Sequence, residues 1–182
     1  MAIAKQFGAD QLLVRSAALA TDTAQVRDVC RAILEEFKAQ AKGYESFAVL
    51  LATNPLRKAG DIRAAFEFWQ QSQAEACLSV VAWDHPPQRA VKIVQDRLKP
   101  AFGIESMKPA QMLEPLYRHD GSMIFAKSSS FLASGQFYME NTAGFLMPRE
   151  RSVDIDTPDD FAWAEFLLRR STAVPVSSGS GA

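Results

Sequence analysis

Apolar residues follow two alternating patterns along the chain: short continuous runs, and sets at helical spacing. The runs at 46–52 and 77–83 are bounded by turn residues, which is typical of strands buried on both faces of a parallel sheet. Between them a helix is predicted to begin at Gly60 or Asp61, with an inner face of Ile62, Ala65, Phe66 and Trp69. Strand, helix and strand in this order predict a βαβ unit of an α/β protein.

The N-terminal part of the chain predicts mainly helices. Residues 1–8 fit the end of a helix with Gly8 at its C-cap, and residues 11–15 fit a short strand or an extended loop. A longer helix is expected to begin at Asp22, where Gln25 three residues later resembles a capping box, and to end near Lys42.

The second half of the chain is less regular at first. Residues 84–120 contain five prolines, at positions 86, 87, 100, 109 and 115, and predict irregular structure. A strand at 122–126, a short helix at 128–134 and a short strand at 144–147 are expected to follow. The last helix is predicted over about 158–171, with a buried face of Phe161, Ala164, Phe166 and Leu167 or Leu168. Residues 172–182 predict a flexible tail.

Composition adds limits rather than a function. A length of 182 residues, 48% of them apolar and 23% charged, fits one soluble globular domain with a sizeable core. The net charge of −1 gives no reason to expect a nucleic-acid or membrane partner. No apolar run could span a bilayer and no signal peptide is evident, so the cytoplasm is the default location. Cys30 and Cys77 fit small core residues rather than a disulfide.

The segment Arg151 to Phe161 carries the strongest chemical signal. If residues 151–156 end a strand, Asp154 and Asp156 lie on one face while Val153 and Ile155 face the core. Two adjacent carboxylates repel each other unless a cation, a donor or a proton lies between them. Mg²⁺ prefers oxygen ligands and often bridges to phosphates, so the pair predicts half of a metal–phosphate site.

A structural interpretation of the same segment stays open. Thr157, Pro158 and the acids after them form a good helix start, with threonine as N-cap and proline at the first helical position. Asp156 would then only turn the chain before that helix.

Other polar segments are expected at the carboxyl end of the sheet, where ligands of open α/β sheets bind. They are residues 52–57, which include Thr53 and Asn54; residues 84–92, which include His85, Arg89 and Lys92; and Arg118 with Asp120. Each has an ordinary explanation as a turn, a stiff loop or a surface charge. Together with the acidic pair they suit an anionic substrate plus a metal, as in phosphoryl or nucleotidyl transfer.

Six segments, in order and spacing, resemble the acylneuraminate cytidylyltransferases, the family that makes CMP-activated sialic, legionaminic or pseudaminic acids. They are AKQFGA at 4–9, LVRSAALATDTA at 13–24, VLLATNPLRKAGDI at 49–62, HPPQRAVKI at 85–93, YRHDGSMIFAK at 117–127 and RSVDIDTPDDFAWAE at 151–165. The resemblance runs to about residue 170. It implies a mixed, mostly parallel α/β sheet flanked by helices, of the Rossmann-like nucleotide-diphospho-sugar transferase type.

The resemblance also implies a reaction and its residues. CTP and a nine-carbon 2-keto sugar acid would give a CMP-sugar and pyrophosphate, with Mg²⁺ held by Asp154 and Asp156. Arg15, Thr53 and Asn54 would bind the nucleotide, and the sugar acid would be bound by His85, Arg89, Lys92, Arg118 and Asp120. The region of about 95–140 matches the arm through which members form homodimers. Residues 1–171 would form an incomplete cytidylyltransferase domain.

Two departures from the family pattern qualify these expectations. Members begin with a strand and a loop of the type ARGGSKRIPGKN that cradles the triphosphate; this sequence lacks such a loop, so a first βαβ portion of roughly 30 residues or more is expected to be missing. Because loss of phosphate-stabilising groups typically lowers rates by orders of magnitude, little activity is expected. Ala52 stands where many members carry a glutamine that reads cytosine, and Asp120 where many carry asparagine. The alternatives are a non-catalytic sugar-acid-binding or assembly paralogue, and a nucleotidyltransferase for another sugar.

Overall fold

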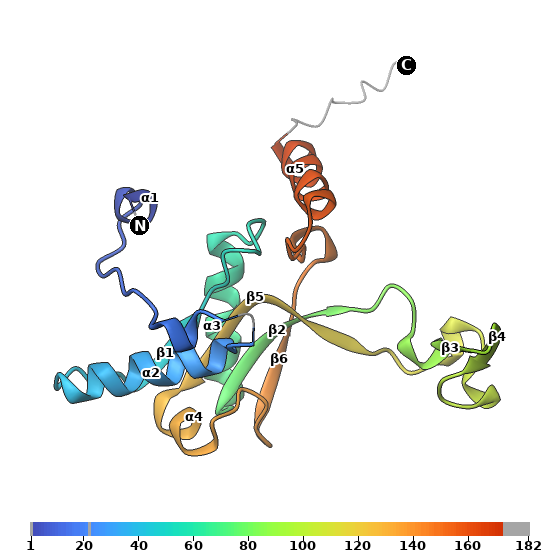
Figure 1. The fold of residues 1–182 in the computed structure, drawn as a ribbon, viewed down its shortest axis with the longest axis horizontal. Coiled ribbons are helices and arrows are strands. Elements are labelled where there is room, and N and C mark those ends of the chain that lie inside the picture. Colours follow the sequence, from blue (N-terminus) through green and yellow to red (C-terminus); the bar gives the residue numbers. More distant parts are fainter. Residues whose placement is uncertain (1, 22, 173–182) are drawn as a thin grey trace, which may run out of the picture.

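A four-stranded mixed sheet forms the centre of the computed structural model, which describes residues 2–21 and 23–172 (Figure 1). The sheet contains β1 (Ser46–Val49), β5 (Tyr117–Lys127), β2 (Ala76–Ala82) and β6 (Thr142–Leu146), in that spatial order. The helices are α1 (Ala2–Gln6), α2 (Val26–Ala39), α3 (Ala59–Ser72), α4 (Ser128–Ser134) and α5 (Pro158–Thr172). A separate hairpin pairs β3 (Val91–Val94) with β4 (Arg97–Pro100).

Strand directions confirm the predicted mixed, mostly parallel α/β sheet. β1 and β2 each pair antiparallel with β5, and β6 pairs parallel with β2. Therefore β1, β2 and β6 run in one direction and β5 runs against them. The predicted βαβ unit is present as β1, α3 and β2, but β5 lies between its two strands.

Helices cover both faces of the sheet and bury alternate residues of each strand. On one face Leu78 and Ile124 pack with Leu34 of α2 and Phe131 of α4. On the other face Cys77, Met123 and Phe125 pack with Ala65 and Trp69 of α3. A third, smaller cluster joins Leu56 and Val153 to Ala164 and Leu167 of α5. This last cluster fixes the acidic segment against the body of the protein.

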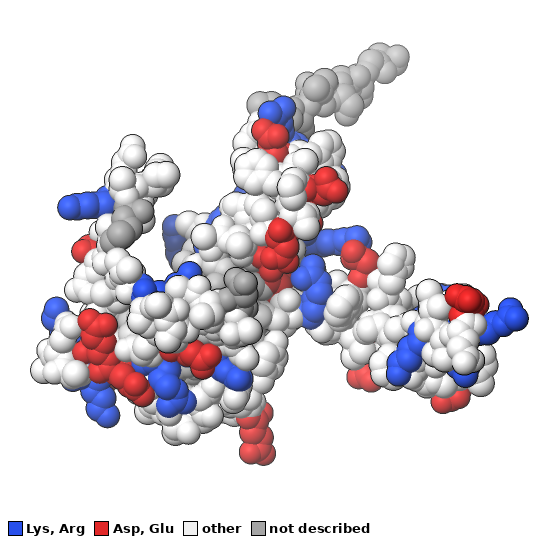
Figure 2. Space-filling view, in the orientation of Figure 1, with Lys and Arg blue, Asp and Glu red and all other residues white. Residues whose placement is uncertain are grey.

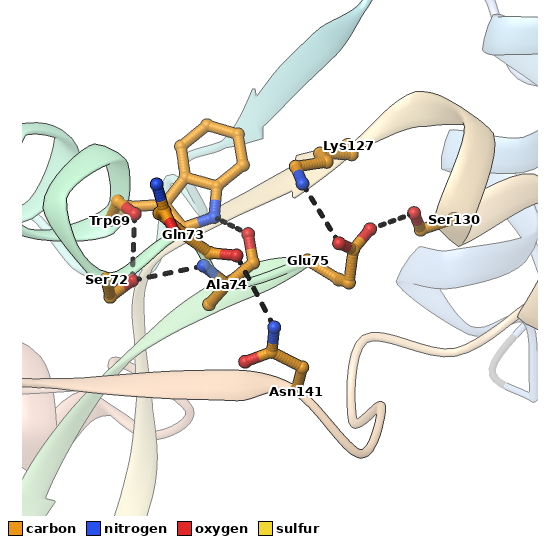
Figure 3. Close-up of polar contacts among 8 residues, drawn as sticks. All are labelled: Trp69, Ser72, Gln73, Ala74, Glu75, Lys127, Ser130 and Asn141. Carbon is orange, nitrogen blue, oxygen red and sulfur yellow. Dashed lines mark hydrogen bonds and ion pairs between the residues drawn. The ribbon is translucent and has the colours of Figure 1, made fainter.

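Hydrogen bonds close the end of the sheet where β2 begins (Figure 3). The Trp69 indole donates to the Ala74 carbonyl at 2.9 Å, and Lys127 Nζ lies 2.9 Å from Glu75 Oε1. The hydroxyl of Ser130 donates to the other oxygen of Glu75. Glu75 therefore ties the start of β2 to the junction of β5 and α4.

The strand at 46–52 was predicted to be buried on both faces, and this is wrong. β1 lies at an edge of the sheet and its residues alternate between exposed and half-buried. It therefore has a strand neighbour on one side only. Phe47 and Val49 pack against the hydrophobic cluster around Leu34 and Phe131, whereas Ser46 and Ala48 are exposed.

Some predicted helix details also differ. α2 begins at Val26 rather than at Asp22, with the Gln25 N–H donating to Asp28 Oδ2 at 3.3 Å; Asp22 lies outside the described residues. In α5 Ala164 and Leu167 are buried as expected, but Phe161 and Phe166 are 62% and 51% exposed, because the helix packs through one narrow stripe. The predicted tail lies outside the described residues beyond Thr172. No described helix is long and apolar enough to cross a membrane.

Residues 84–116 form an arm that extends away from the sheet (Figure 1). The arm contains the β3–β4 hairpin and short 3₁₀ turns rather than the wholly irregular structure predicted from its prolines. Of the region of about 95–140 assigned to a dimer arm, the part up to the first residues of β5 projects, and the rest of β5 and α4 belong to the body (Figure 1).

Candidate functional site

The acidic segment 152–156 is an extended connection, without the strand that was predicted at its start. The Ile155 N–H donates to the Thr53 carbonyl at 2.9 Å, which holds the segment beside the loop after β1. Val153 and Ile155 contribute to the third hydrophobic cluster, while Asp154 is half-buried and Asp156 exposed. The side chains of residues 153–156 therefore alternate between core and cleft as predicted, although the segment does not pair with a strand of the sheet.

The helix start after this segment uses other residues than the acidic pair. The Asp160 N–H donates to Thr157 Oγ1 at 3.3 Å, and Asp160 Oδ2 accepts from the Thr157 N–H at 2.9 Å. The Thr157 hydroxyl and the nearby N–H groups lower the pKa of Asp160. Since Thr157 and Asp160 cap α5, the side chain of Asp156 is not required for that purpose.

Asn54 connects the loop after β1 to Asp154. Its side chain is fully buried, and its Nδ2 donates to Asp154 Oδ1 at 3.0 Å. The loop itself is held by Arg57, whose Nη1 donates to the carbonyls of Leu51 and Asn54 at 2.6 and 2.8 Å. Burial lowers the pKa of Arg57, while the charge of Asp120 opposes this shift.

An irregularity in β5 brings Asp120 into the same network. Leu78 of β2 faces Ile124, but Val80 faces His119, so residues 120–123 of β5 oppose Ser79 alone. Such bulges re-aim side chains near functional sites. Asp120 is 1% exposed and accepts from the Ser122 N–H at 3.1 Å and from Ser79 Oγ at 2.5 Å.

Gly121 makes the close approach of the loop possible. Its φ is +77°, a conformation that side chains with a Cβ rarely adopt. A Cβ at this position would also lie 2.8 Å from Asn54 Nδ2 and 3.6 Å from Asp154 Oδ2. The absence of a Cβ at Gly121 therefore leaves room for the hydrogen bond between Asn54 and Asp154.

Asp154 and Asp156 line a cleft of about 620 Å³ between α5 and the sheet. Arg118, Asp84, Arg149 and Trp163 also line this cleft, and Arg149 forms an ion pair with Asp84 at 2.5 Å. Figure 2 shows basic and acidic surfaces next to each other where α5 meets the body. The cleft is therefore polar and of mixed charge, a surrounding that suits a phosphorylated ligand together with a cation.

The residues that lead into the acidic segment are held by a bidentate ion pair. Arg151 Nε and Nη2 donate to the two oxygens of Asp61 at 2.9 and 2.8 Å, and the Lys58 N–H donates to Asp61 Oδ2 at 2.8 Å. Burial acts to raise the pKa of Asp61, but the hydrogen bonds from Arg151 and Lys58 outweigh it and the pKa is lowered. The start of α3 therefore anchors residue 151, three positions before Asp154.

The structure does not bring all the predicted site residues together. His85 and Arg89 line a separate pocket of about 390 Å³, and Lys92 is exposed on β3. Arg15 lines an apolar pocket of about 530 Å³ with Ala52, between α2 and β1. Thr53 is exposed and contributes its carbonyl to the Ile155 hydrogen bond. The convergent set is Asn54, Asp120 and Asp154, with Arg118 and Asp156 in the cleft beside it.

Sequence reasoning missed Ser79, Ser122, Arg57 and Arg151, which hold this set in place. For Ser122 a signal was present: Asp120 and Gly121 were interpreted as a turn before a strand, whereas they lie inside one long strand. The other three carry no local pattern that separates them from ordinary polar residues.

The carboxylates of Asp154 and Asp156 fit a hard cation such as Mg²⁺ as part of its ligand shell. Among residues 2–21 and 23–172, no group of three or more His, Cys, Asp or Glu side chains is placed to hold a metal ion. Mg²⁺ is commonly bound by one or two carboxylates, with water and substrate phosphates as its remaining ligands. Asp154 and Asp156 in a polar cleft meet that requirement.

Comparison with known proteins gives consistent relatives, although no protein-family model matches the chain. The CMP-N,N'-diacetyllegionaminic acid synthase of Legionella pneumophila is 30% identical over 169 residues, which are 91% of this chain and 72% of that protein. The pseudaminic acid cytidylyltransferase of Campylobacter jejuni is 26% identical over 168 residues, 92% of this chain and 72% of that protein. The N-acylneuraminate cytidylyltransferase of Escherichia coli is 29% identical over 164 residues, 90% of this chain but 38% of that protein.

Proposed function

The chain belongs to the acylneuraminate cytidylyltransferase family, and on that premise we propose that it transfers CMP from CTP to a sialic-acid-like nonulosonic acid and releases pyrophosphate. The observation that carries the proposal is the pairing of Asn54 with Asp154, beside Asp156, in a cleft that Arg118 also lines. The carboxylates and the Arg118 guanidinium line one cleft, and this supports binding of a nucleotide phosphate together with a sugar carboxylate.

We propose that Asp154 and Asp156 hold Mg²⁺. When bound, Mg²⁺ would neutralise phosphate charge as it develops during nucleotidyl transfer. The protein's own contribution is to fix the orientation of Asp154 through Asn54 and to keep the two carboxylates on one side of the segment. The third hydrophobic cluster packs that segment against α5 through Val153 and Ile155.

Substrate contacts are proposed in two groups. Arg15, Thr53 and Asn54 are proposed for the nucleotide, with Asn54 acting through Asp154. Arg118, at the cleft, and His85, Arg89 and Lys92, on the arm, are proposed for the sugar acid. The burial of Asp120 favours a role in positioning over direct contact with substrate.

We further propose that residues 1–182 alone catalyse the reaction slowly. The sequence contains no Gly/Arg/Lys-rich loop of the kind that cradles a triphosphate. Backbone N–H groups and cations of such a loop would stabilise the β- and γ-phosphates. A test of the site must therefore include a measurement other than turnover.

Tb³⁺ provides that measurement, because it prefers oxygen ligands and luminesces when a neighbouring tryptophan is excited. Trp163 lines the same cleft as the acidic pair. We expect Tb³⁺ luminescence that Mg²⁺ competes away, and a reduction of Tb³⁺ affinity by about 100-fold or more in Asp154→Asn and Asp156→Asn. Asp159→Asn removes an exposed acid from the first turn of α5 and serves as the charge-matched control.

Pyrophosphate release from CTP and a sialic-type acid tests the reaction itself. Asp154→Asn should lower the rate by a factor on the order of 10² to 10³, as when a group that stabilises transition-state charge is removed. Tb³⁺ binding that is unchanged in both acidic-pair variants would contradict the metal site. Calorimetric binding of the sugar acid without any response to CTP would instead support a non-catalytic sugar-acid-binding protein.

The arm supports a homodimer, which we propose as the working assembly. Its large apolar side chains are strongly exposed, including Ile93 (75%), Leu98 (69%), Phe102 (62%) and Ile104 (77%). Exposed apolar surface gathered on one projection is typical of an interface. Leu98→Glu should shift the protein from dimer to monomer in sedimentation analysis, whereas Phe161→Glu on α5 should not. A monomeric unmodified protein at micromolar concentration would contradict the assembly.

A further inference from the structure

We infer that Asp120 and Ser122 are positioning residues for Asp154 and act through the side-chain amide of Asn54. The inference rests on the proposed function, because it concerns the orientation of a carboxylate proposed to bind a cation.

The network is continuous from the core to the cleft. Ser79 Oγ and Ser122 Oγ contact the two oxygens of Asp120 at 2.5 and 2.9 Å, and Ser122 Oγ lies 3.1 Å from Asn54 Oδ1. Asn54 Nδ2 then donates to Asp154 Oδ1 at 3.0 Å. Ser79, Asp120, Ser122 and Asn54 are each 1% exposed or less, so solvent does not compete for these hydrogen bonds.

Ser122 fixes which end of the Asn54 amide faces Asp154. When the Ser122 hydroxyl donates to Asn54 Oδ1, it keeps the amide oxygen toward Ser122 and the NH₂ group toward the carboxylate. If the amide rotated by half a turn, its oxygen would face Asp154 Oδ1 and repel it. The correct orientation leaves one oxygen of Asp154 bound to Asn54 and directs the other away from it.

Ser122 has one hydroxyl hydrogen but two acceptors. It can donate to Asp120 Oδ2 or to Asn54 Oδ1, and a carboxylate at position 120 attracts the hydrogen more strongly than an amide oxygen does. An amide at position 120 would donate to Ser122 Oγ and leave the hydroxyl hydrogen for Asn54. The geometry therefore predicts that asparagine at 120 strengthens the hydrogen bond from Ser122 to Asn54.

Tb³⁺ affinity, measured by luminescence with Mg²⁺ as competitor, tests the inference on the full chain. Ser122→Ala and Asn54→Ala should each weaken Tb³⁺ binding about tenfold or more, the usual effect of losing a residue that orients a metal ligand. Asp120→Asn should bind Tb³⁺ at least as tightly as the unmodified protein. Ser130→Ala, which removes a hydroxyl bound to Glu75 at the other end of the sheet, is the matched control and should leave affinity unchanged.

The pattern of results distinguishes this inference from the proposed site. Unchanged Tb³⁺ affinity in Asn54→Ala and Ser122→Ala, with affinity lost in Asp154→Asn, overturns the inference and leaves the metal site standing. Unchanged affinity in Asp154→Asn overturns both. Circular dichroism of each variant checks folding; should Ser122→Ala fail to fold, Asp120→Asn still decides, because weaker binding in that near-isosteric variant contradicts the hydrogen-bond count.

Discussion

The two ends of the sheet each hold a carboxylate by hydrogen bonds, but they differ in what balances its charge. At the end shown in Figure 3, Glu75 contacts the ammonium group of Lys127 and a serine hydroxyl. At the other end, Asp154 contacts only the neutral amide of Asn54. Among the described residues, no Lys, Arg or His forms an ion pair with Asp120, Asp154 or Asp156.

This difference separates a structural contact from the proposed binding site. A carboxylate that the protein neutralises internally contributes to the folded state and has no need of a ligand. Carboxylates held in place without an ion-pair partner favour a cation from solution, and such an arrangement is typical of functional sites. The ends should therefore respond differently to mutation: one in stability, the other in metal affinity.

The largest stability effect is expected from Trp69→Ala at the Glu75 end. Trp69 is 6% exposed, and its indole N–H donates to the Ala74 carbonyl. Its ring stacks on that of Phe125, with the ring centroids 5.8 Å apart. Removing a buried aromatic side chain should lower the free energy of unfolding by about 3–5 kcal/mol. Urea unfolding followed by circular dichroism measures this, and the folded variant should keep its Tb³⁺ affinity.

Trp163→Ala is the matched control at the cleft end. Trp163 is 52% exposed, so its removal should change stability by only about 0.5 kcal/mol while abolishing most of the Tb³⁺ luminescence that it sensitises. Equal loss of stability in the two tryptophan variants would contradict the division between the ends.

Asp61→Asn should have an intermediate effect, because its partner Arg151 leads into the acidic segment. Loss of charged hydrogen bonds in this largely buried pair should cost about 1.5–3 kcal/mol near neutral pH. The pKa of Asp61 is lower in the folded protein, so its stabilisation is present above the ordinary value of 3.8 and is lost as pH falls through the folded value. Unfolding of both proteins across this range measures the difference.

The control is Glu165→Gln, which breaks an exposed pair with Arg169 on α5. Pairs of this kind contribute about 0.3–0.5 kcal/mol. A loss in Asp61→Asn no greater than in this control, or one that persists at low pH, would show that Arg151 is not anchored by the ion pair.

Much of the fold could be predicted from local patterns. Apolar runs and helical spacing located β2, α3, α4 and α5, because these elements bury continuous or periodic apolar surfaces. The edge position of β1 and the exposure of Phe161 and Phe166 were not predictable, since both depend on which neighbours a segment meets. The β3–β4 hairpin was hidden because its strands are exposed and carry no alternation between core and solvent.

The site was predictable in its acidic pair but not in its support. Asp154 and Asp156 follow from i, i+2 spacing, and the expectation that polar segments gather at the carboxyl end of the sheet added Asn54 and Arg118. The contact between Asn54 and Asp154 joins residues 100 positions apart, and Asp120 points into the sheet because of the bulge opposite Ser79. Such contacts arise from tertiary packing and leave no trace in sequence spacing.

The smallest expected effect is a shift of the thermal midpoint. It distinguishes the two ends of the sheet best, because a charge-removing variant at each end should shift the midpoint in a different way. The Ser130 hydroxyl and then Lys127 lower the pKa of Glu75, so Glu75→Gln should lower the thermal midpoint slightly at neutral pH. This loss should vanish as pH falls through the folded pKa, below the ordinary value of 4.5. Asp154→Asn, without divalent cations, should leave the midpoint unchanged or raise it, because it removes a charge that the protein does not balance. Scanning calorimetry in chelator-treated buffer compares the two, and a similar fall in both would mean that Asp154 is a structural carboxylate like Glu75.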